Sequence, residues 1–194
     1  MKKNENLKLL ALFAVIVLLG VGIAYAALST TLTVTFGKVT QNALTWKVGF
    51  TGTSATGTRT GTSATGASCG AATNTESAVT VADTTLSKPE DGCIYKLQVK
   101  NSGGIAAKLG TVTPTKPSST TCGTASGANM VCGNITYKLT TDSAGSTVIS
   151  SSNFTVGAGA TKDLYLVVRY TGTSLASSAI TQSGASFSLP FNQA

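Results

Sequence analysis

The sequence predicts an all-β protein, a single antiparallel β-sandwich or jelly roll preceded by an N-terminal hydrophobic export helix. Apolar and polar residues alternate with a period of two in many short segments. Clusters of Gly, Asn, Ser and Pro separate these segments, and no stretch after residue 27 keeps the apolar spacing of a helix. Many short strands joined by such turn residues are typical of a β-sandwich.

The first 26 residues have the composition of an export signal. A basic segment at residues 1–8 is followed by an unbroken apolar run at residues 9–23. Ala24 and Ala26 then provide the small side chains that signal peptidase requires, so we expect cleavage before Ala27. This predicts a secreted or cell-surface protein whose single domain forms the rest of the chain.

An uncleaved membrane anchor is the alternative interpretation of the same segment. Residues 9–28 are apolar, and a helix of about 20 such residues spans a bilayer. The basic N-terminus would then stay in the cytoplasm, with the domain of residues 27–194 outside the cell. The membrane is a partner of the chain only in this case.

Residues 27–36 form the first predicted strand. Leu28, Leu32, Val34 and Phe36 face one side of it, and hydroxyl side chains face the other. Because this strand directly follows the cleavage site, processing would leave it as a free apolar arm. Such an arm either completes its own sheet or adds to the sheet of a neighbour, so residues 27–36 are a candidate donor strand.

Later segments repeat the alternation. Residues 164–170 are apolar on both faces, as expected of an inner strand. Pro190 interrupts the last segment. Because proline cannot donate to a β-ladder, it indicates either an edge strand or a position that faces away from the neighbouring strand. The predicted strands after the first are residues 44–50, 77–81, 95–99, 105–112, 135–139, 148–149, 154–156, 164–170 and 187–191.

A segment rich in Thr and Gly occupies residues 51–73. The sequence GTSATG occurs twice in it, at residues 52–57 and 61–66. This low complexity predicts a long flexible hairpin tip. A glycosylated loop and a flat threonine array that binds ice or sugar are alternatives, although two copies are too few for an extended array.

Four cysteines, all in the exported part, predict two disulfides and an oxidising compartment. Among the three pairings that four cysteines allow, Cys122–Cys132 is the most local, which leaves Cys69–Cys93. A zinc site is the alternative, but the spacings contain no C-x2-C knuckle. We therefore expect no metal site.

Composition removes most catalytic chemistry. The chain has no His, so it cannot form a Ser-His-Asp triad or a His-ligated metal site. Charged residues make up 11% of it, against about 25% in ordinary soluble domains. The 33 Thr and 21 Ser supply the polar surface instead. We expect no enzyme activity, no catalytic residue and no cofactor.

The net charge is +7, but the basic residues are spread singly, which does not predict a nucleic-acid partner.

Three further residues are expected to be structural. Trp46, the only Trp, lies on the apolar face of its predicted strand, and we expect it in the core rather than on a sugar-binding surface. Glu90 and Asp91 precede a glycine and follow a proline, which predicts a turn. Weak calcium binding by these adjacent carboxylates is the alternative.

A set of familiar patterns runs along nearly the whole chain: AYAALSTTLTVT at 24–35, LTWKVGF at 44–50, TLSKPEDGCIYKLQVKNSGGIAA at 85–107, GAGATKDLYLVVRY at 157–170 and SFSLPFNQA at 186–194. With these patterns the chain resembles small exported proteins of Gram-positive-type bacteria that have a TasA- or camelysin-like β-sandwich. The resemblance implies an extracellular jelly-roll subunit. In the TasA group, such subunits polymerise into matrix fibres or pili by donor-strand exchange. The Thr-rich insert, the four cysteines and Pro190 depart from the pattern of that group.

Two functions of different classes follow as expectations. The first is a structural subunit of a fibre, pilus or biofilm matrix, in which residues 27–36 complete the sheet of the next copy, so that the main partner is the protein itself. The second is a membrane-tethered or secreted monomeric binding or adhesion module. Its loops at residues 51–73 or 114–132 would contact cell-surface glycans.

Overall fold

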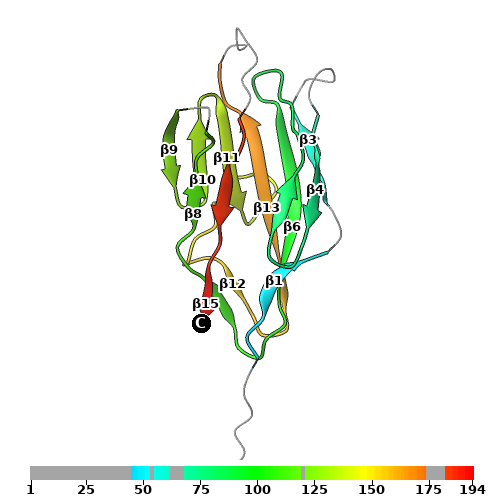
Figure 1. The fold of residues 1–194 in the computed structure, drawn as a ribbon, viewed down its shortest axis with the longest axis vertical. Helices are drawn as coiled ribbons and strands as arrows, with labels where there is room; N and C mark the ends of the chain where they lie inside the picture. The colour runs from blue at the N-terminus through cyan, green and yellow to red at the C-terminus, as the bar shows by residue number, and fades with distance from the viewer. Residues whose placement is uncertain (1–44, 53–54, 62–67, 119–120, 174–181) are drawn as a thin grey trace, which may run out of the picture. The chain divides into compact units, whose positions relative to one another are not determined.

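The computed structural model describes residues 45–52, 55–61, 68–118, 121–173 and 182–194 (Figure 1). The predicted export helix, its cleavage site and the predicted first strand lie outside these residues. Throughout the described part the fold is all-β, its sheets are antiparallel, and it contains no helix. This part accordingly has no helix that is long and apolar enough to cross a membrane. The all-β prediction is confirmed for these residues.

The largest sheet has seven strands (Figure 1). Two ten-residue strands, β6 and β13, pair with each other along nearly their whole length. β1 and β3 both pair with β6, while β11, β10 and β9 continue the sheet beyond β13. The bounds are β1 Val48–Thr51, β3 Thr58–Thr60, β6 Gly92–Asn101, β9 Cys122–Ser126, β10 Asn129–Cys132, β11 Ile135–Thr140 and β13 Thr161–Tyr170.

Three smaller sheets complete the described part. The first has the order β12-β7-β15, the second pairs β14 with β8, and the third has the order β2-β4-β5. Their bounds are β2 Ala55–Thr56, β4 Ala71–Asn74, β5 Val79–Val81, β7 Ala107–Leu109, β8 Thr113–Thr115, β12 Thr155–Val156, β14 Ser186–Ser188 and β15 Phe191–Gln193.

Strict alternation along β6 separates the two faces of the large sheet. Tyr95, Leu97 and Val99 are buried, whereas Lys96 and Lys100 between them are exposed. Successive side chains of a strand point to opposite faces, so the odd-numbered residues of β6 define the core face. On β13 the core face carries the even-numbered residues, because the register places Leu164 opposite Leu97.

One apolar cluster packs against this core face. It includes Leu109 and Val156 from the small β12-β7-β15 sheet together with Leu97 and Leu164 from the large one. Phe154, which directly precedes β12, is also fully buried in it. Full burial of each such side chain contributes about 1.5–3 kcal/mol relative to exposure, so this shared cluster is the main source of stability.

Parts of the Thr- and Gly-rich insert form strands. β2 pairs with β4, and β3 pairs with the first half of β6. Between them, Gly57 lies so close to Tyr95 that an added Cβ would be 2.6 Å from the ring and 2.7 Å from the Cys69 side chain. At residues 55–56, 58–60 and 71–73 the structure therefore has strands where the sequence predicted a loop, because low complexity still supplies the backbone groups and the glycine that this ladder needs. The prediction for residues 53–54 and 62–67 lies outside the described residues.

The prediction that Trp46 belongs to the core is also wrong, because its side chain is 39% exposed. β1 begins only at Val48. The residues on either side of Trp46 pair instead with the turn after β6, where Ser102 N donates to Lys47 O and Gly104 N donates to Thr45 O. Trp46 thus lies past the end of the β6 strand that supplies the core.

Several strands depart from the predicted ones in extent or existence. The segments at 95–99, 135–139 and 164–170 are observed as parts of β6, β11 and β13. The segment at 148–149 makes only an isolated bridge to Thr140. β9 and β10 are not among the predicted strands, because CGTAS in β9 has no apolar alternation. A tight turn at Gly127, with φ of 56°, joins them.

Both disulfides join the cysteines in the expected pairs. Cys69 is bonded to Cys93 at the start of β6, with Cα atoms 5.6 Å apart. Cys122 is bonded to Cys132, which is its directly opposed residue on the neighbouring strand of the β9–β10 pair. Two disulfides fit an extracellular or otherwise oxidising environment.

Asn101 at the end of β6 is a fully buried polar side chain. Its amide donates to Ile105 O at 2.7 Å and to Val156 O at 3.1 Å, and its Oδ1 accepts from Gly103 N at 3.0 Å. One side chain therefore connects the large sheet, the turn after β6 and β12. Each of these backbone groups would otherwise need another partner in the interior.

The turn after β11 is closed by the carboxylate of Asp142. Its Oδ1 accepts from Ser146 N at 3.1 Å, and its Oδ2 accepts from Thr147 N at 2.7 Å. These backbone donors hold the pKa of Asp142 at about 2, below its ordinary value of 3.8. Because the pKa is lowered in the folded state, the contribution of Asp142 is present above pH 3.8 and is lost as the pH falls through about 2.

We therefore expect the Ser146 and Thr147 amides to keep their protection from hydrogen exchange at pH 4 and to lose it towards pH 2. Asp142→Ala should remove that protection at pH 7, while Asp83→Ala, at an exposed residue, should not change it. NMR-detected exchange measures both effects. Unchanged protection in Asp142→Ala would show that the carboxylate does not hold the turn.

Candidate strand-acceptor edge

The donor side of the predicted assembly lies outside the described residues. This applies to the cleavage site and to the apolar face of the donor strand, namely Ala24, Ala26, Ala27, Leu28, Leu32, Val34 and Phe36. The structure describes instead the part of the chain that could receive such a strand. The best candidate is the segment at residues 186–193, which contains β14 and β15.

Even-numbered residues of this segment bond to one side. Asn192 is opposite Lys108 on β7, and Ser186 and Ser188 are opposite Thr115 and Thr113 on β8. Gly110 N donates to Pro190 O at 2.7 Å, and Ala194 N donates to Ala106 O at 2.9 Å. In an antiparallel pair, the residues between hydrogen-bonded positions direct their backbone groups the other way.

The odd-numbered residues therefore turn their N–H and C=O groups to the second edge of the segment. These residues are Phe187, Leu189, Phe191 and Gln193. In the part of the chain that the structure describes, no strand pairs with this edge. The side chains of the first three pack on the apolar cluster but stay partly exposed. An added strand would thus find apolar surface and backbone groups that no other described strand pairs with.

Phe191 joins residues 186–193 to the apolar cluster through a contact between two aromatic rings. Its ring centroid is 6.3 Å from that of Phe154, with the planes tilted by 54°. This tilted geometry is favourable for two aromatic rings. The Lys162 ammonium lies 4.7 Å from the centroid of the Phe154 ring, so that ring also makes a cation–π contact.

Pro190 lies on the paired side of the segment. Its carbonyl accepts from Gly110, and its missing N–H interrupts the ladder between β14 and β15. Opposite this break the register between the strands shifts by one residue within 110–113, which is a β-bulge. The last strand is an edge strand within the described residues, as one of the two sequence interpretations requires. Pro190 does not face away from its neighbour, as the other required.

Other described edges are less suited to an apolar strand. β9 presents Cys-Gly-Thr-Ala-Ser with little apolar surface. On the opposite edge of the large sheet, Phe50 N already donates to Glu76 O. β5 has an open second edge among the described residues, and Val79 and Val81 pack on the core, but it is only three residues long.

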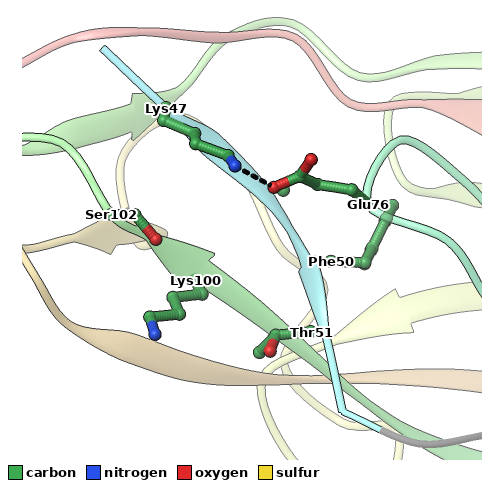
Figure 2. Close-up of a pocket in the computed structure, with 7 residues that line it drawn as sticks. Lys47, Phe50, Thr51, Glu76, Lys100 and Ser102 are labelled. Carbon is green, nitrogen blue, oxygen red and sulfur yellow. Dashed lines mark ion pairs between the residues drawn. The ribbon is translucent and has the colours of Figure 1, made fainter. Parts of the chain in front are cut away.

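Figure 2 shows a small polar pocket of about 190 Å³ beside β1 and β6. The ammonium of Lys47 points to the carboxylate of Glu76, with a separation of 2.7 Å. Both side chains are more than half exposed, and such surface pairs contribute roughly 0–1 kcal/mol. Lys100 and Ser102 complete one wall. These residues form an ordinary surface ion pair and no pair of nucleophile and base.

The second ion pair is also an ordinary surface pair. Lys96 Nζ lies 2.8 Å from Asp163 Oδ2, and Gln98 Nε2 donates to Asp163 Oδ1 at 3.1 Å. The hydrogen bond from Lys96 lowers the pKa of Asp163, and the same bond raises the pKa of Lys96. Both shifts stabilise the charged forms that already exist at neutral pH.

Glu90 and Asp91, which the sequence predicts to form a turn, have surroundings that fit this structural role. Asp91 is fully buried, and its Oδ2 accepts from Ser87 N and Lys88 N. Glu90 beside it adopts a positive φ of 71°, as a turn residue does. Across the described ranges, no three His, Cys, Asp or Glu residues group together in a way that could hold a metal ion.

No family model matches the sequence, and comparison with curated proteins and with solved structures finds no significant similarity. Function is therefore inferred from the residues of this chain and their geometry.

Proposed function

We propose that the protein is an extracellular structural subunit of a fibre, pilus or biofilm matrix that assembles by donor-strand exchange. The observation that carries this proposal is the second edge of residues 186–193. It offers outward backbone groups beside partly exposed Phe187, Leu189 and Phe191. Residues 28–36 of another copy would pair with this edge, because main-chain hydrogen bonds supply affinity and alternate side chains supply register.

The two segments match in length and pattern. At about 3.3 Å per residue, the nine residues 28–36 extend over roughly 30 Å and the eight residues 186–193 over roughly 26 Å. Leu32, Val34 and Phe36 repeat every second position, as do Phe187, Leu189 and Phe191. Each subunit would give one strand and receive one, and such a heterologous contact propagates into a filament unless it closes into a ring.

The same proposal includes the finer architecture and the location. The large sheet and the smaller sheets on its core face would form the two layers of an antiparallel sandwich or jelly roll, supported by the apolar cluster that they share. Export through residues 1–26, with cleavage before Ala27, would release the donor strand. The two disulfides support an oxidising location.

A structural role fits the chemistry better than catalysis does. The chain has no His, and the acidic side chains with lowered pKa values, Asp142 and Asp163, are held by turn amides and by a surface lysine. The hydroxyl that donates to Asp142, Ser146 Oγ, belongs to the same turn and helps to close it. We therefore propose no enzyme activity and no cofactor.

The rival proposal is a tethered or secreted monomer that keeps residues 27–36 in its own sheet and uses its surface as a binding module. N-terminal sequencing separates the two. A chain that begins at Ala27 allows the strand to be exchanged, whereas a chain that begins at Met1 in the membrane fraction favours the tether.

Gln193→Pro tests the acceptor edge directly. Gln193 is exposed, and its N–H points away from β7, so proline removes one outward donor and leaves the β7 ladder in place. Losing one backbone hydrogen bond of about 1 kcal/mol should raise the critical concentration for fibre assembly about fivefold. Sedimentation of fibres at a series of concentrations measures it.

Gln193→Ala is the matched control, because it removes the same side chain and keeps the N–H. We expect it to assemble like the unchanged protein. Equal critical concentrations for the proline and alanine variants would overturn the assignment of this edge as the acceptor. A monomeric unchanged protein, seen by size-exclusion chromatography and negative-stain microscopy, would overturn the proposed function itself.

A further inference from the structure

The face of the large sheet that points away from the apolar cluster carries a pocket of about 250 Å³. It lies over β10, β11 and β13 and is bounded by the turn that Asp142 closes. Val167 is buried at its base, and Gly145 of the turn lies against it, since an added Cβ would be 3.4 Å from the Val167 methyl groups. The pocket is thus formed by a sheet and a hydrogen-bonded turn.

Two cationic side chains line this pocket. Lys138 is opposite Val167, and Arg169 is two residues further along β13, so the two cations occupy diagonal positions on adjacent strands. Side chains at such positions have Cα atoms about 7–8 Å apart and can reach a common partner. No residue that lines the pocket is acidic. Both ion pairs of the described part involve other lysines.

This arrangement favours an anion. Like charges at neighbouring positions of a sheet repel each other, and a carboxylate between them would remove the repulsion while forming charge-assisted hydrogen bonds. Arg169 also lacks a hydrogen-bond acceptor for its Nε, which is buried and has no hydrogen-bond partner. A guanidinium is the side chain best shaped to bind a carboxylate through two parallel hydrogen bonds.

Neutral polar groups continue the lining beside the cations. The hydroxyls of Thr136 and Thr171 are 3.1 Å apart, and Thr171 Oγ1 also donates to Asn134 O. With Thr171 donating to that carbonyl, Thr136 donates to Thr171 and keeps its own lone pairs for an incoming hydroxyl. The Oδ1 of Asn129, which also lines the pocket, has no hydrogen-bond partner.

We infer that this pocket binds one acidic sugar unit of an extracellular polysaccharide, with the carboxylate between Lys138 and Arg169 and the ring hydroxyls on Thr136 and Asn129. Its volume of about 250 Å³ is below the roughly 300–1,000 Å³ of pockets that enclose drug-sized ligands, which suits a single sugar unit. The side chains belong to the face opposite the acceptor edge, so binding and assembly are independent of each other.

Titration with digalacturonic acid, followed by NMR chemical shifts of the purified protein, tests this inference. We expect saturable shifts at the amides of Thr136, Lys138 and Arg169, and none with the neutral disaccharide lactose. Arg169→Gln and Lys138→Gln should each weaken binding about tenfold, since each removes a charge-assisted hydrogen bond. Lys108→Gln, an exposed cation on β7, is the matched control and should bind normally.

Three results would overturn the inference. They are the absence of saturable shifts, equal affinity in the two pocket variants and the control, and equally tight binding of inorganic phosphate, which would indicate a site for any anion. Thermal unfolding of each variant verifies that it is folded. If a variant is unfolded, the position of the shifts on the unchanged protein decides between this pocket and another site. The titration uses the monomeric fraction from size-exclusion chromatography, so the result is independent of whether fibres form.

Discussion

Replacing both Leu32 and Val34 by Asp is expected to abolish fibre assembly and to leave a folded monomer. In the proposed contact, both side chains enter the apolar surface beside Phe187, Leu189 and Phe191. A carboxylate buried there without a partner costs several kcal/mol, roughly 2–7 for a polar group and more for a charge. The described apolar cluster is built from β6, β13 and the smaller sheets, none of which the substitutions change, so we expect the rest of the fold to persist.

The matched control is Thr33→Asp with Thr35→Asp. These positions belong to the same strand and add the same charge, but they point to the opposite face. Negative-stain microscopy and size-exclusion chromatography should show fibres for the control and monomer for the first variant. Fibres formed by Leu32→Asp with Val34→Asp would disprove the strand exchange. Loss of fibres in both variants would show that charge, rather than burial, prevents assembly.

The largest loss of stability from a single small truncation is expected for Asn101→Ala. The substitution leaves Ile105 O, Val156 O and Gly103 N without their buried partner. At about 1 kcal/mol for each lost hydrogen bond, the free energy of unfolding should fall by about 3 kcal/mol. In a domain of this size, about 2–4 °C per kcal/mol gives a decrease in Tm of roughly 6–12 °C.

Thermal unfolding monitored by circular dichroism measures this change. Asn192→Ala, at an exposed position on β15, is the control and should alter the free energy of unfolding by less than about 0.5 kcal/mol. If Asn101→Ala were no more destabilising than the control, the three hydrogen bonds would not be what joins β6 to β12.

The strands that sequence alone predicts well are those with a buried and an exposed face. In β6 and β11, apolar residues recur at every second position because one face meets the core. β13 between them is recognised instead by its continuous apolar run. β9 escapes prediction because it lies at the edge of the large sheet and buries little. The predicted burial of Trp46 fails for a related reason. The apolar alternation of β1 extends N-terminal to Val48, into residues that pair with the turn after β6 and not with the core strand itself.

The candidate sites, too, are only partly predictable from the sequence. The alternation of Phe187, Leu189 and Phe191 and the edge preference of Pro190 are visible in the sequence. The choice of the free edge is not, because it depends on which strands occupy the other side. Lys138 and Arg169 are 31 positions apart in sequence, and only the register between β11 and β13 brings them together.

In the proposed assembly, the position of the acceptor edge in the chain has a consequence for the order of events during secretion. Residues 186–193 follow residue 36 by 150 positions or more, so in the proposed export from the N-terminus the donor strand would leave the cell well before them. The strand would therefore emerge before its own edge exists outside the cell, while finished copies would already display theirs. Timing alone would direct the strand to a neighbour rather than to itself, and the growing end of a filament would lie at the site of export.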